Sequence, residues 1–318
     1  MRRIAVWAGL LLTACAAGQE PIPPTYGQPP TPRIVAYVIA ELQQGDLGSA
    51  VALVSQYRKL NGDTPEALYA LSWLARGEAA AGDIATATQD AEEIEHAAKT
   101  ALATRKLDSE PYLPLALGSA YEVQAEILAK ENKRSEVLQL LRSAMTTWRG
   151  TSLIDRLQKN INLLTLEGKP MPLLRATEWI AGKPAHPNAW RGKPLLLFFW
   201  AHWCADCKAE APIIARLAQE FEPKGLYVLA PTRLYGYTAQ DDHASPQEER
   251  AFVERVYQKY YAAIPGAEVP LDTGNFERFG VSTTPTIVLA DRRGIVRLYH
   301  PGVMEEAALR DALQELTR

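Results

Sequence analysis

The chain has 318 residues, which exceeds the usual size of one domain and predicts two domains behind a leader. Hydrophobic residues make up 47% and charged residues 22% of the chain, a composition that argues against a disordered protein or a membrane protein with many spans. The formal net charge of −3 suggests no basic patch for phosphate groups, so we expect protein partners and no nucleic acid.

The chain begins with the pattern of a signal peptide: two arginines, then an apolar stretch, residues 4–12, too short to span a bilayer. The stretch ends in Leu-Thr-Ala-Cys, which resembles the bacterial lipobox and implies that Cys15 is diacylated and becomes the mature N-terminus. Ala16 is not an aspartate, which in that family favours the outer membrane of a Gram-negative cell. The alternative is ordinary cleavage after a small residue, with Cys15 removed or left as a free thiol.

Proline is dense between residues 21 and 32, and such a segment stays extended and hydrated. We therefore predict a lipoprotein-type signal peptide over residues 1–14 and a proline-rich tether over residues 15–32. The folded part is expected outside the cytoplasm, in the periplasm where the cell has one, anchored to a membrane through the lipid on Cys15.

Residues 33–169 are predicted to form an all-α domain, because apolar positions recur there at helical spacing and strand patterns are almost absent. Short polar breaks separate the helices at Gly45-Asp46, Gly82-Asp83 and Asn132-Lys133, and Thr64-Pro65 marks a helix start. The spacing resembles a tetratricopeptide-type array of three irregular helical pairs. Such an array offers a concave surface for a peptide or protein, or it serves only as a docking spacer for the second domain.

From residue 172 to residue 318 strands alternate with helices, the signature of an α/β fold. The continuous apolar run over residues 195–200 is typical of a buried central strand. Further strands are predicted at residues 226–230, 286–290 and 295–299, and helices at about residues 207–221, 248–261 and 305–316.

The central strand is followed by Cys204-Ala205-Asp206-Cys207 at the start of a helix. Unpaired backbone N–H groups and the positive end of the helix dipole stabilise a thiolate at Cys204. Cys207, one turn on, can then attack a mixed disulfide that Cys204 has formed. The pattern predicts a nucleophile and a resolving thiol for thiol-disulfide exchange.

Metal binding is the main alternative. A structural zinc site needs two further ligands, but the only other cysteine is Cys15 and the histidines show no paired spacing. His202, two residues before Cys204, could support the thiolate or a copper ion, although no second soft ligand is evident. We therefore predict no metal and no bound cofactor.

The sequence of residues 199–212, from Phe-Trp-Ala-His-Trp-Cys to Glu-Ala-Pro, together with Val-Ser-Thr-Thr-Pro-Thr at residues 281–286, resembles the TlpA-like thiol-disulfide oxidoreductases of the redoxin family. The resemblance covers roughly residues 172–318 and implies an α/β thioredoxin fold with a central mixed sheet. It also implies a cis bond at Thr284-Pro285 that faces the disulfide, with Thr284 offering backbone groups to an extended substrate chain.

The resemblance further implies that Glu210 is buried near the cysteine pair and assists proton transfer with Cys207. Without the family resemblance, Glu210 would be expected to face solvent, as most helical glutamates do, and Pro285 could simply begin a strand. The candidate catalytic residues are Cys204, Cys207, Glu210 and Pro285, and the candidate substrate-binding residues are Trp203 and Thr284.

Two features depart from the family pattern. Asp206 stands where proline is common, and its negative charge beside the thiolate should raise the pKa of the thiol and favour a reductant over a strong oxidant, with Lys208 opposing it. Residues 232–270 lengthen the path from the cysteines to Pro285. This insertion either lies beside the site and shapes the choice of substrate protein, or is an ordinary crossover helix with a surface loop.

We therefore expect an extracytoplasmic enzyme that reduces disulfides in partner proteins and, by the family resemblance, receives electrons from a membrane donor protein. The alternatives are a lipid-anchored scaffold whose redox domain is regulatory, and a disulfide oxidase or isomerase that carries the same motif.

Overall fold

The computed structural model describes residues 30–176, 178–182 and 189–318. The predicted signal peptide, the lipid anchor at Cys15 and nearly all of the tether lie outside these residues. Within the described ranges no helix combines the length and the apolar composition that a membrane span requires.

The described part of the first half is all-helical, as predicted. Asp46, Thr64 and Asp83 each accept a hydrogen bond from a backbone N–H of the following first turn, which explains why the helices begin at the polar breaks. The helices are α1 (Arg33–Gln43), α2 (Leu47–Asn61), α3 (Pro65–Ala81), α4 (Ile84–Ala101), α5 (Leu113–Lys130), α6 (Arg134–Thr147) and α7 (Leu153–Thr165), with a short 3₁₀ helix, η1 (Leu107–Ser109).

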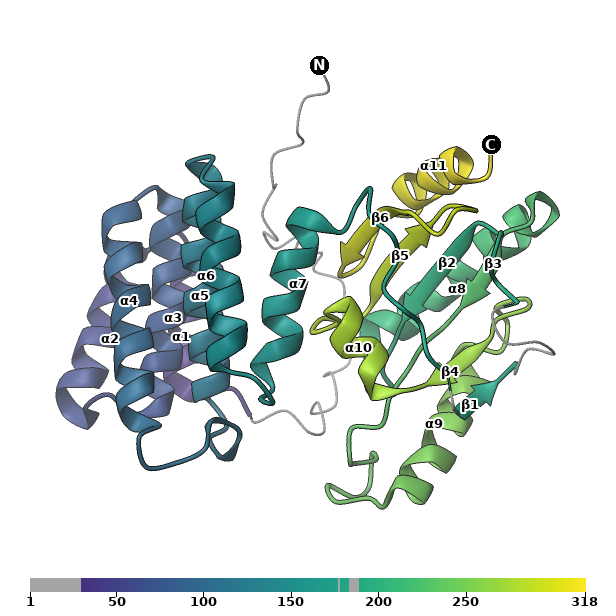
Figure 1. Ribbon diagram of the computed structural model, residues 1–318. Coiled ribbons are helices and arrows are strands. Elements are labelled where there is room, and N and C mark those ends of the chain that lie inside the picture. The colour runs from purple at the N-terminus through teal and green to yellow at the C-terminus, as the bar shows by residue number, and fades with distance from the viewer. Residues whose placement is uncertain (1–29, 177, 183–188) are drawn as a thin grey trace.

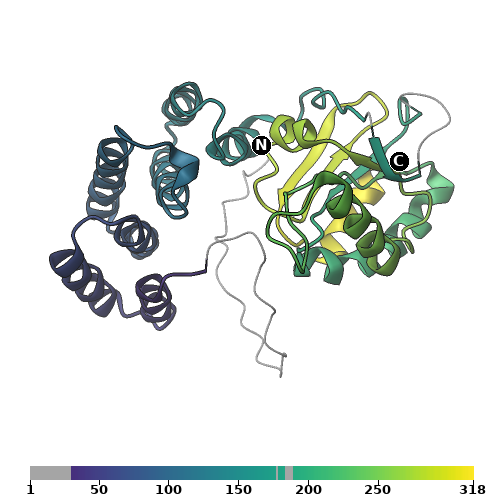
Figure 2. The ribbon, with the colours of Figure 1, turned by 90° about the horizontal axis from the view of Figure 1, so that it is seen from below.

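These helices form two rows. Helices α1, α3, α5 and α7 contact one another in order, and α2, α4 and α6 pack against that row from outside. Seen from below, the helices follow an arc, with α7 next to the second half of the chain (Figure 2). The inner row therefore supplies the side of the array that faces the second half. The tetratricopeptide-like identity of the array stays a prediction.

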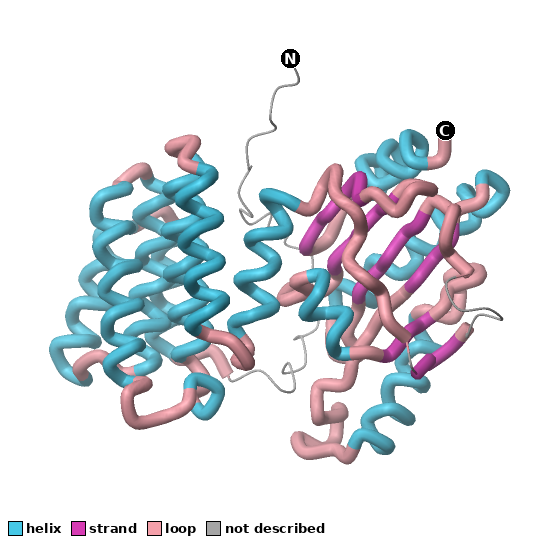
Figure 3. Tube along the Cα trace, viewed as in Figure 1, coloured by secondary structure: helices cyan, strands magenta, loops and turns pink. Residues whose placement is uncertain are grey.

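The second half is a mixed sheet with helices on both faces (Figures 1 and 3). The main sheet has the strand order β3-β2-β5-β6, with β2 parallel to β3 and antiparallel to β5. The strands are β1 (Glu178–Ala181), β2 (Leu195–Phe199), β3 (Tyr227–Leu229), β4 (Val269–Leu271), β5 (Thr286–Ala290) and β6 (Val296–Pro301). The helices are α8 (Ala205–Phe221), α9 (Pro246–Tyr260), α10 (Thr273–Phe279), α11 (Glu306–Leu316) and the 3₁₀ helix η2 (Glu222–Lys224).

Strand β2 is buried at all five residues, as its continuous apolar run predicts. Leu196 and Phe198 point into a core formed with α8, α9 and α11. The alternate residues of the strand point into a second core formed with α10 and with Leu166, just after α7. Because successive side chains of a strand face opposite sides, one apolar run fills both layers.

Helix α7 joins the two halves. It contacts α5 and α6 on one side and α10 and β6 on the other. The Asn162 side chain donates a hydrogen bond to the carbonyl of Phe279 over 2.9 Å, and both are buried. The backbone of Gly280 approaches α7 so closely that a Cβ atom there would lie 2.5 Å from the backbone nitrogen of Lys159. The last helix of the array is therefore docked on the mixed sheet domain.

The sequence analysis missed three short elements. Strands β1 and β4 pair antiparallel in a separate two-stranded sheet, and α10 is a single short helix. Strands of three or four residues and a helix of seven are too short to show a periodic pattern. Helix α8 also begins two residues earlier than predicted, because Cys204 is its N-cap.

Candidate active site

The two cysteines lie where β2 gives way to α8. Cys204 caps the helix, and its Sγ atom accepts a hydrogen bond from the backbone N–H of Cys207 over 3.0 Å. The two residues are joined by a disulfide in this structure. The predicted placement of a sulfur at a helix N-terminus is thus observed, and such a position favours a thiolate.

Access to the pair is narrow. Cys204 is 3% exposed and Cys207 is fully buried. Between them Ala205 and Asp206 are exposed, so the first turn of α8 lies at the surface. Cys204 is therefore the sulfur that a partner can approach, and Cys207 is suited to react only with Cys204.

The loop before β5 lies at the same edge of the sheet. Phe199, the last residue of β2, is paired with Thr286, the first residue of β5. Because the two strands are antiparallel, the chain after β2 and the chain before β5 leave the sheet at one end. The Thr284-Pro285 bond in that loop is cis.

Glu210 is buried on α8, one turn beyond Cys207 and 1% exposed. Its Oε1 atom accepts a hydrogen bond from the backbone N–H of Met304 over 3.0 Å, while Oε2 has no hydrogen-bond partner among the described residues. Burial raises the pKa of Glu210 to about 7, and the nearby charge of Asp206 contributes to the rise. A carboxyl group with this pKa can accept and release a proton near neutral pH.

His202 is 2% exposed, and its Nε2 atom lies 3.0 Å from Oε1 of Glu249 on α9. The Glu249 carboxylate also accepts hydrogen bonds from the backbone N–H groups of Tyr235 and Gly236, over 2.5 and 2.7 Å. The Nε2 atom of His202 is thus engaged by a carboxylate, which makes it unavailable to a copper ion. Within the described ranges no three His, Cys, Asp or Glu side chains converge to bind a metal.

Part of the insertion over residues 232–270 lies beside Trp203 and His202, and the insertion also contains the crossover helix α9. A role in the choice of substrate stays a prediction. The rings of Tyr235 and Trp203 meet edge to face, with centroids 5.6 Å apart. Arg233 stacks on Tyr235 and forms an ion pair of 2.9 Å with Asp155 of α7. The insertion therefore connects the residue before Cys204 to the helical array.

Trp203 is half-buried, and its indole nitrogen has no hydrogen-bond acceptor in the described part of the chain. Thr284 is likewise half-buried, and Pro285 is buried. Trp203, Cys204 and Cys207 follow the end of β2, and Thr284 and Pro285 precede the start of β5 at the same end of the sheet, while Glu210 lies one turn beyond Cys207 on α8. Cys15 lies outside the described residues.

Glu249 and Arg233 were missed by the sequence analysis. Ser245 and Glu248 form a capping box that fixes the start of α9. The pattern Ser-Pro-x-Glu at residues 245–248 could have located this start and placed Glu249 in the first turn. Its partner His202 lies 47 residues away, so nothing local could have revealed the pairing.

Residues 189–317 match the model of the family described as a thioredoxin-like domain. The chain is 29% identical over 147 residues to the thiol:disulfide interchange protein DsbE of Pseudomonas fluorescens biotype C, a match that covers 46% of this chain and 72% of that protein. It is 28% identical over 124 residues to the DsbE protein of Xylella fastidiosa strain Temecula1, covering 38% of this chain and 54% of the relative. The chain thus spans about half the length of the latter.

A solved structure, the exposed lipoprotein thioredoxin of Streptococcus pneumoniae strain TIGR4, matches with 29% identity and a TM-score of 0.32. The match covers 40% of this chain and 87% of that one.

Proposed function

We propose that the whole protein reduces disulfides in partner proteins outside the cytoplasm, because residues 189–317 match a thioredoxin-like domain and the chain is similar to thiol:disulfide interchange proteins. The observation that carries this proposal is the Cys204–Cys207 disulfide at the N-terminus of α8, at the sheet edge where the Thr284-Pro285 loop also lies. Residues 33–169 are proposed to form a separate helical domain, and residues 172–318 the redox domain.

The reaction proceeds in two exchanges. The thiolate of Cys204 attacks one sulfur of a substrate disulfide, and the other substrate sulfur leaves as a thiolate and takes up a proton. Cys207 then loses its proton, and its thiolate attacks Sγ of Cys204. This forms the Cys204–Cys207 disulfide and releases the second substrate thiol. Two electrons pass to the substrate, whose disulfide becomes two thiols.

Glu210 is proposed as the group that receives the proton of Cys207, because it is buried one turn away and the pKa of its carboxyl group is raised to about 7 by burial. Thr284 and Pro285 are proposed to hold the substrate chain in extended form next to Cys204, and Trp203 to contact it. The oxidised pair is then reduced by a membrane donor protein, so the cycle needs no bound cofactor.

The location is proposed from the sequence. A lipid on Cys15 and the tether over residues 15–32 would hold the folded part at a membrane surface in the periplasm, with Ala16 favouring the outer membrane. Labelling with a radioactive fatty acid tests this anchor, because Cys15→Ser should abolish both the label and the membrane fraction.

The activity is tested with the full chain and two variants. Cys204→Ser should abolish reduction of a protein disulfide, while Cys207→Ser should stall as mixed disulfides whose captured partners can be identified. A wild-type protein that reduces no disulfide would favour a scaffold. A reduction potential of about −120 mV, the value of a dedicated oxidase, would contradict the proposed direction of electron flow.

A further inference from the structure

A cavity of about 380 Å³ lies between the helical array and the loop that precedes β5. Its array side comes from α3, α5, α7 and the residue before α7, and its other side from Ser282 and Thr283, which directly precede the Thr284-Pro285 bond. The residues that the following paragraphs use are Arg76, Glu122, Arg156, Lys159, Ser282 and Thr283.

Cationic side chains dominate this cavity. Arg76, Arg156 and Lys159 line it together with one carboxylate, Glu122, so its net charge is +2. Glu122 is ion-paired with all three cations. Burial alone would raise the pKa of Glu122, but the three cations, Arg156 foremost, lower it well below its ordinary value. Glu122 therefore stays ionised and pairs with all three cations, but its single negative charge leaves the cavity with a net charge of +2.

The cations are fixed by the surrounding helices. Arg156 donates hydrogen bonds to the carbonyl of Leu115 and to the Ser119 hydroxyl, over 3.2 and 3.1 Å. Its side chain lies against Gly118, where a Cβ atom would be 2.6 Å from its Nη1 atom. Arg76 donates to Ser119 over 3.0 Å, yet its buried Nε has no acceptor among the described residues. The side chains of this network are thus held in place before any ligand binds, and Nε of Arg76 remains available as a donor.

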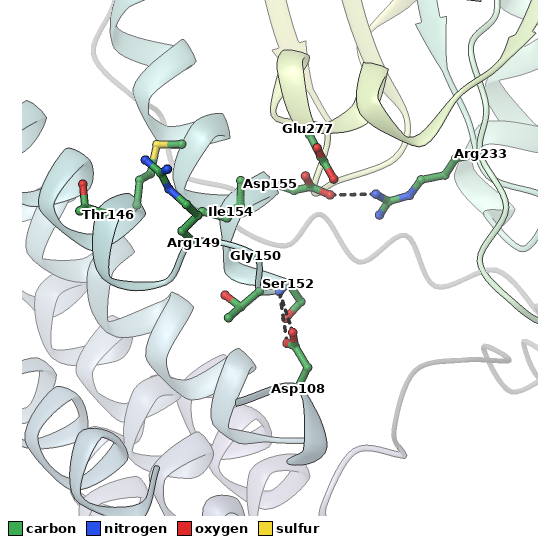
Figure 4. A pocket seen from close by; sticks show the side chains of 11 residues that line it. Asp108, Thr146, Arg149, Gly150, Ser152, Ile154, Asp155, Arg233 and Glu277 are labelled. Atoms are coloured by element: carbon green, nitrogen blue, oxygen red, sulfur yellow. Dashed lines mark hydrogen bonds and ion pairs between the residues drawn. The ribbon is translucent and has the colours of Figure 1, made fainter. Parts of the chain in front are cut away.

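A neighbouring cavity, on the other side of the start of α7, has a different character (Figure 4). It is lined by Arg149 and Arg233 together with Asp108, Asp155 and Glu277, and Asp155 is paired with Arg233. Its carboxylates outnumber its cations, so of these two cavities the one that borders Ser282 and Thr283 carries the positive excess.

We propose that this cavity binds an acidic segment of the substrate protein, close in sequence to the cysteine that Cys204 attacks. The inference rests on the proposed function and adds the chemistry by which a substrate is chosen. Ser282 and Thr283 line the cavity and directly precede the Thr284-Pro285 bond, so a substrate chain held along this loop passes beside the cavity. The array would thereby supply part of the substrate site.

The chain's own N-terminal segment fits this cavity less well. Residues 15–29, which remain after the predicted cleavage, contain a single acidic residue, Glu20, and no basic residue, so they balance only half of a charge of +2. A protein substrate with several carboxylates near its cysteine does complement it, and opposite charges increase both the rate of encounter and the selectivity.

The test uses the reduced full chain and two synthetic peptides, each with one intramolecular disulfide. The peptides differ only in the residues next to one cysteine, which are glutamates in the first and glutamines in the second. We expect the wild type to reduce the acidic peptide about three- to tenfold faster, a preference that should fall as ionic strength rises from about 0.05 M to about 1 M. Arg76→Gln and Lys159→Gln should each reduce the preference, and Arg76→Lys should retain most of it.

Lys130→Gln is the matched control, because Lys130 is a cation of the same array that, within the described ranges, pairs with Glu126 alone and does not line the cavity. Equal rates for the two peptides in the wild type would overturn the inference alone, and failure to reduce either peptide would overturn the proposed function. A preference that survives in Arg76→Gln and Lys159→Gln would also overturn the inference.

Discussion

Nε2 of His202 and Oε1 of Glu249 lie 3.0 Å apart, and both side chains are 1% exposed. The same carboxylate accepts hydrogen bonds from the backbone N–H groups of Tyr235 and Gly236. One buried group therefore connects three segments: the turn before Cys204, the insertion loop and α9. A buried carboxylate is stable only when its oxygens are hydrogen-bonded, and this one accepts at both oxygens. We infer that Glu249 is a positioning residue for the loop that packs on Trp203.

Glu249→Gln is expected to lower the free energy of unfolding by about 2 kcal/mol, because an amide cannot accept at both ends and leaves a buried donor unpaired. The rate of disulfide reduction should fall as well, since Tyr235 would lose its fixed contact with Trp203. Urea unfolding and the peptide reduction rate measure the two effects.

Glu248→Gln is the control for this variant. Glu248 is exposed and accepts hydrogen bonds from Ser245 in the capping box of α9, a role that a glutamine can also fill. Glu248→Gln should therefore change stability less than Glu249→Gln does and leave the reduction rate unchanged. Equal effects of the two substitutions on the rate would show that Glu249 has no positioning role.

Glu210→Gln should change how stability depends on pH. Burial raises the pKa of Glu210 to about 7 from an ordinary value of 4.5, so between these values the folded protein holds a proton that the unfolded chain has lost. The wild type therefore loses stability as pH rises from about 4.5 to about 7, by at most about 3 kcal/mol. The variant cannot titrate, so its stability relative to the wild type should increase across this window and level off above it.

Urea unfolding of the oxidised protein between about pH 4.5 and pH 8 measures this difference. Glu306→Gln should differ from the wild type by a nearly constant amount over this range, because Arg216 and Arg310 lower the pKa of Glu306 and its contribution to stability changes only below about pH 4.5. A difference between Glu210→Gln and the wild type that does not change with pH would contradict the assignment.

Much of this site could be predicted from the sequence because it depends on local signals. The apolar run of β2, the Cys-x-x-Cys motif and the helix after it are contiguous, and the structure has them in that order. The pairing of Phe199 with Thr286 joins residues distant in sequence, and only the resemblance to a known family suggested that Pro285 belongs to the site. The cluster of Arg76, Glu122 and Arg156 depends on how helices stack, which no local pattern specifies.

Asp206→Asn is expected to raise the reduction potential. Asp206 is exposed in the first turn of α8, between the two cysteines, where its charge disfavours a thiolate on Cys204. Removing the charge stabilises the thiolate and hence the reduced form. A full pKa unit corresponds to about 30 mV, and because solvent screens an exposed charge we expect about 10–20 mV.

Equilibration with glutathione buffers measures the potential, and Glu131→Gln in the helical array serves as a remote charge control. An unchanged or lower potential in Asp206→Asn would show that this charge does not influence the thiolate.

Gly280→Ala is expected to separate the array from the redox domain. Gly280 has a φ of 62°, and a Cβ atom there would lie 2.5 Å from the nitrogen of Lys159 and 2.7 Å from the carbonyl carbon of Gln158, both backbone atoms of α7. The left-handed backbone conformation of an alanine lowers the free energy of unfolding by about 1 kcal/mol. The clash of its methyl group with the backbone of α7 adds about 1–3 kcal/mol.

Gly294→Ala is the matched control, because it carries the backbone cost without the clash. Gly294 has a φ of 74°, but a Cβ atom there meets nothing within 4 Å, so only the backbone cost of about 1 kcal/mol applies. Thermal unfolding should therefore show a clearly larger loss for Gly280→Ala. Because Lys159 lines the cationic cavity and Ser282 follows Gly280 by two residues, the same substitution should also weaken the preference for the acidic peptide, whereas Gly294→Ala should not. Equal losses of stability in the two variants would mean that α7 yields to the added methyl group and that its docking on the sheet domain is not tight.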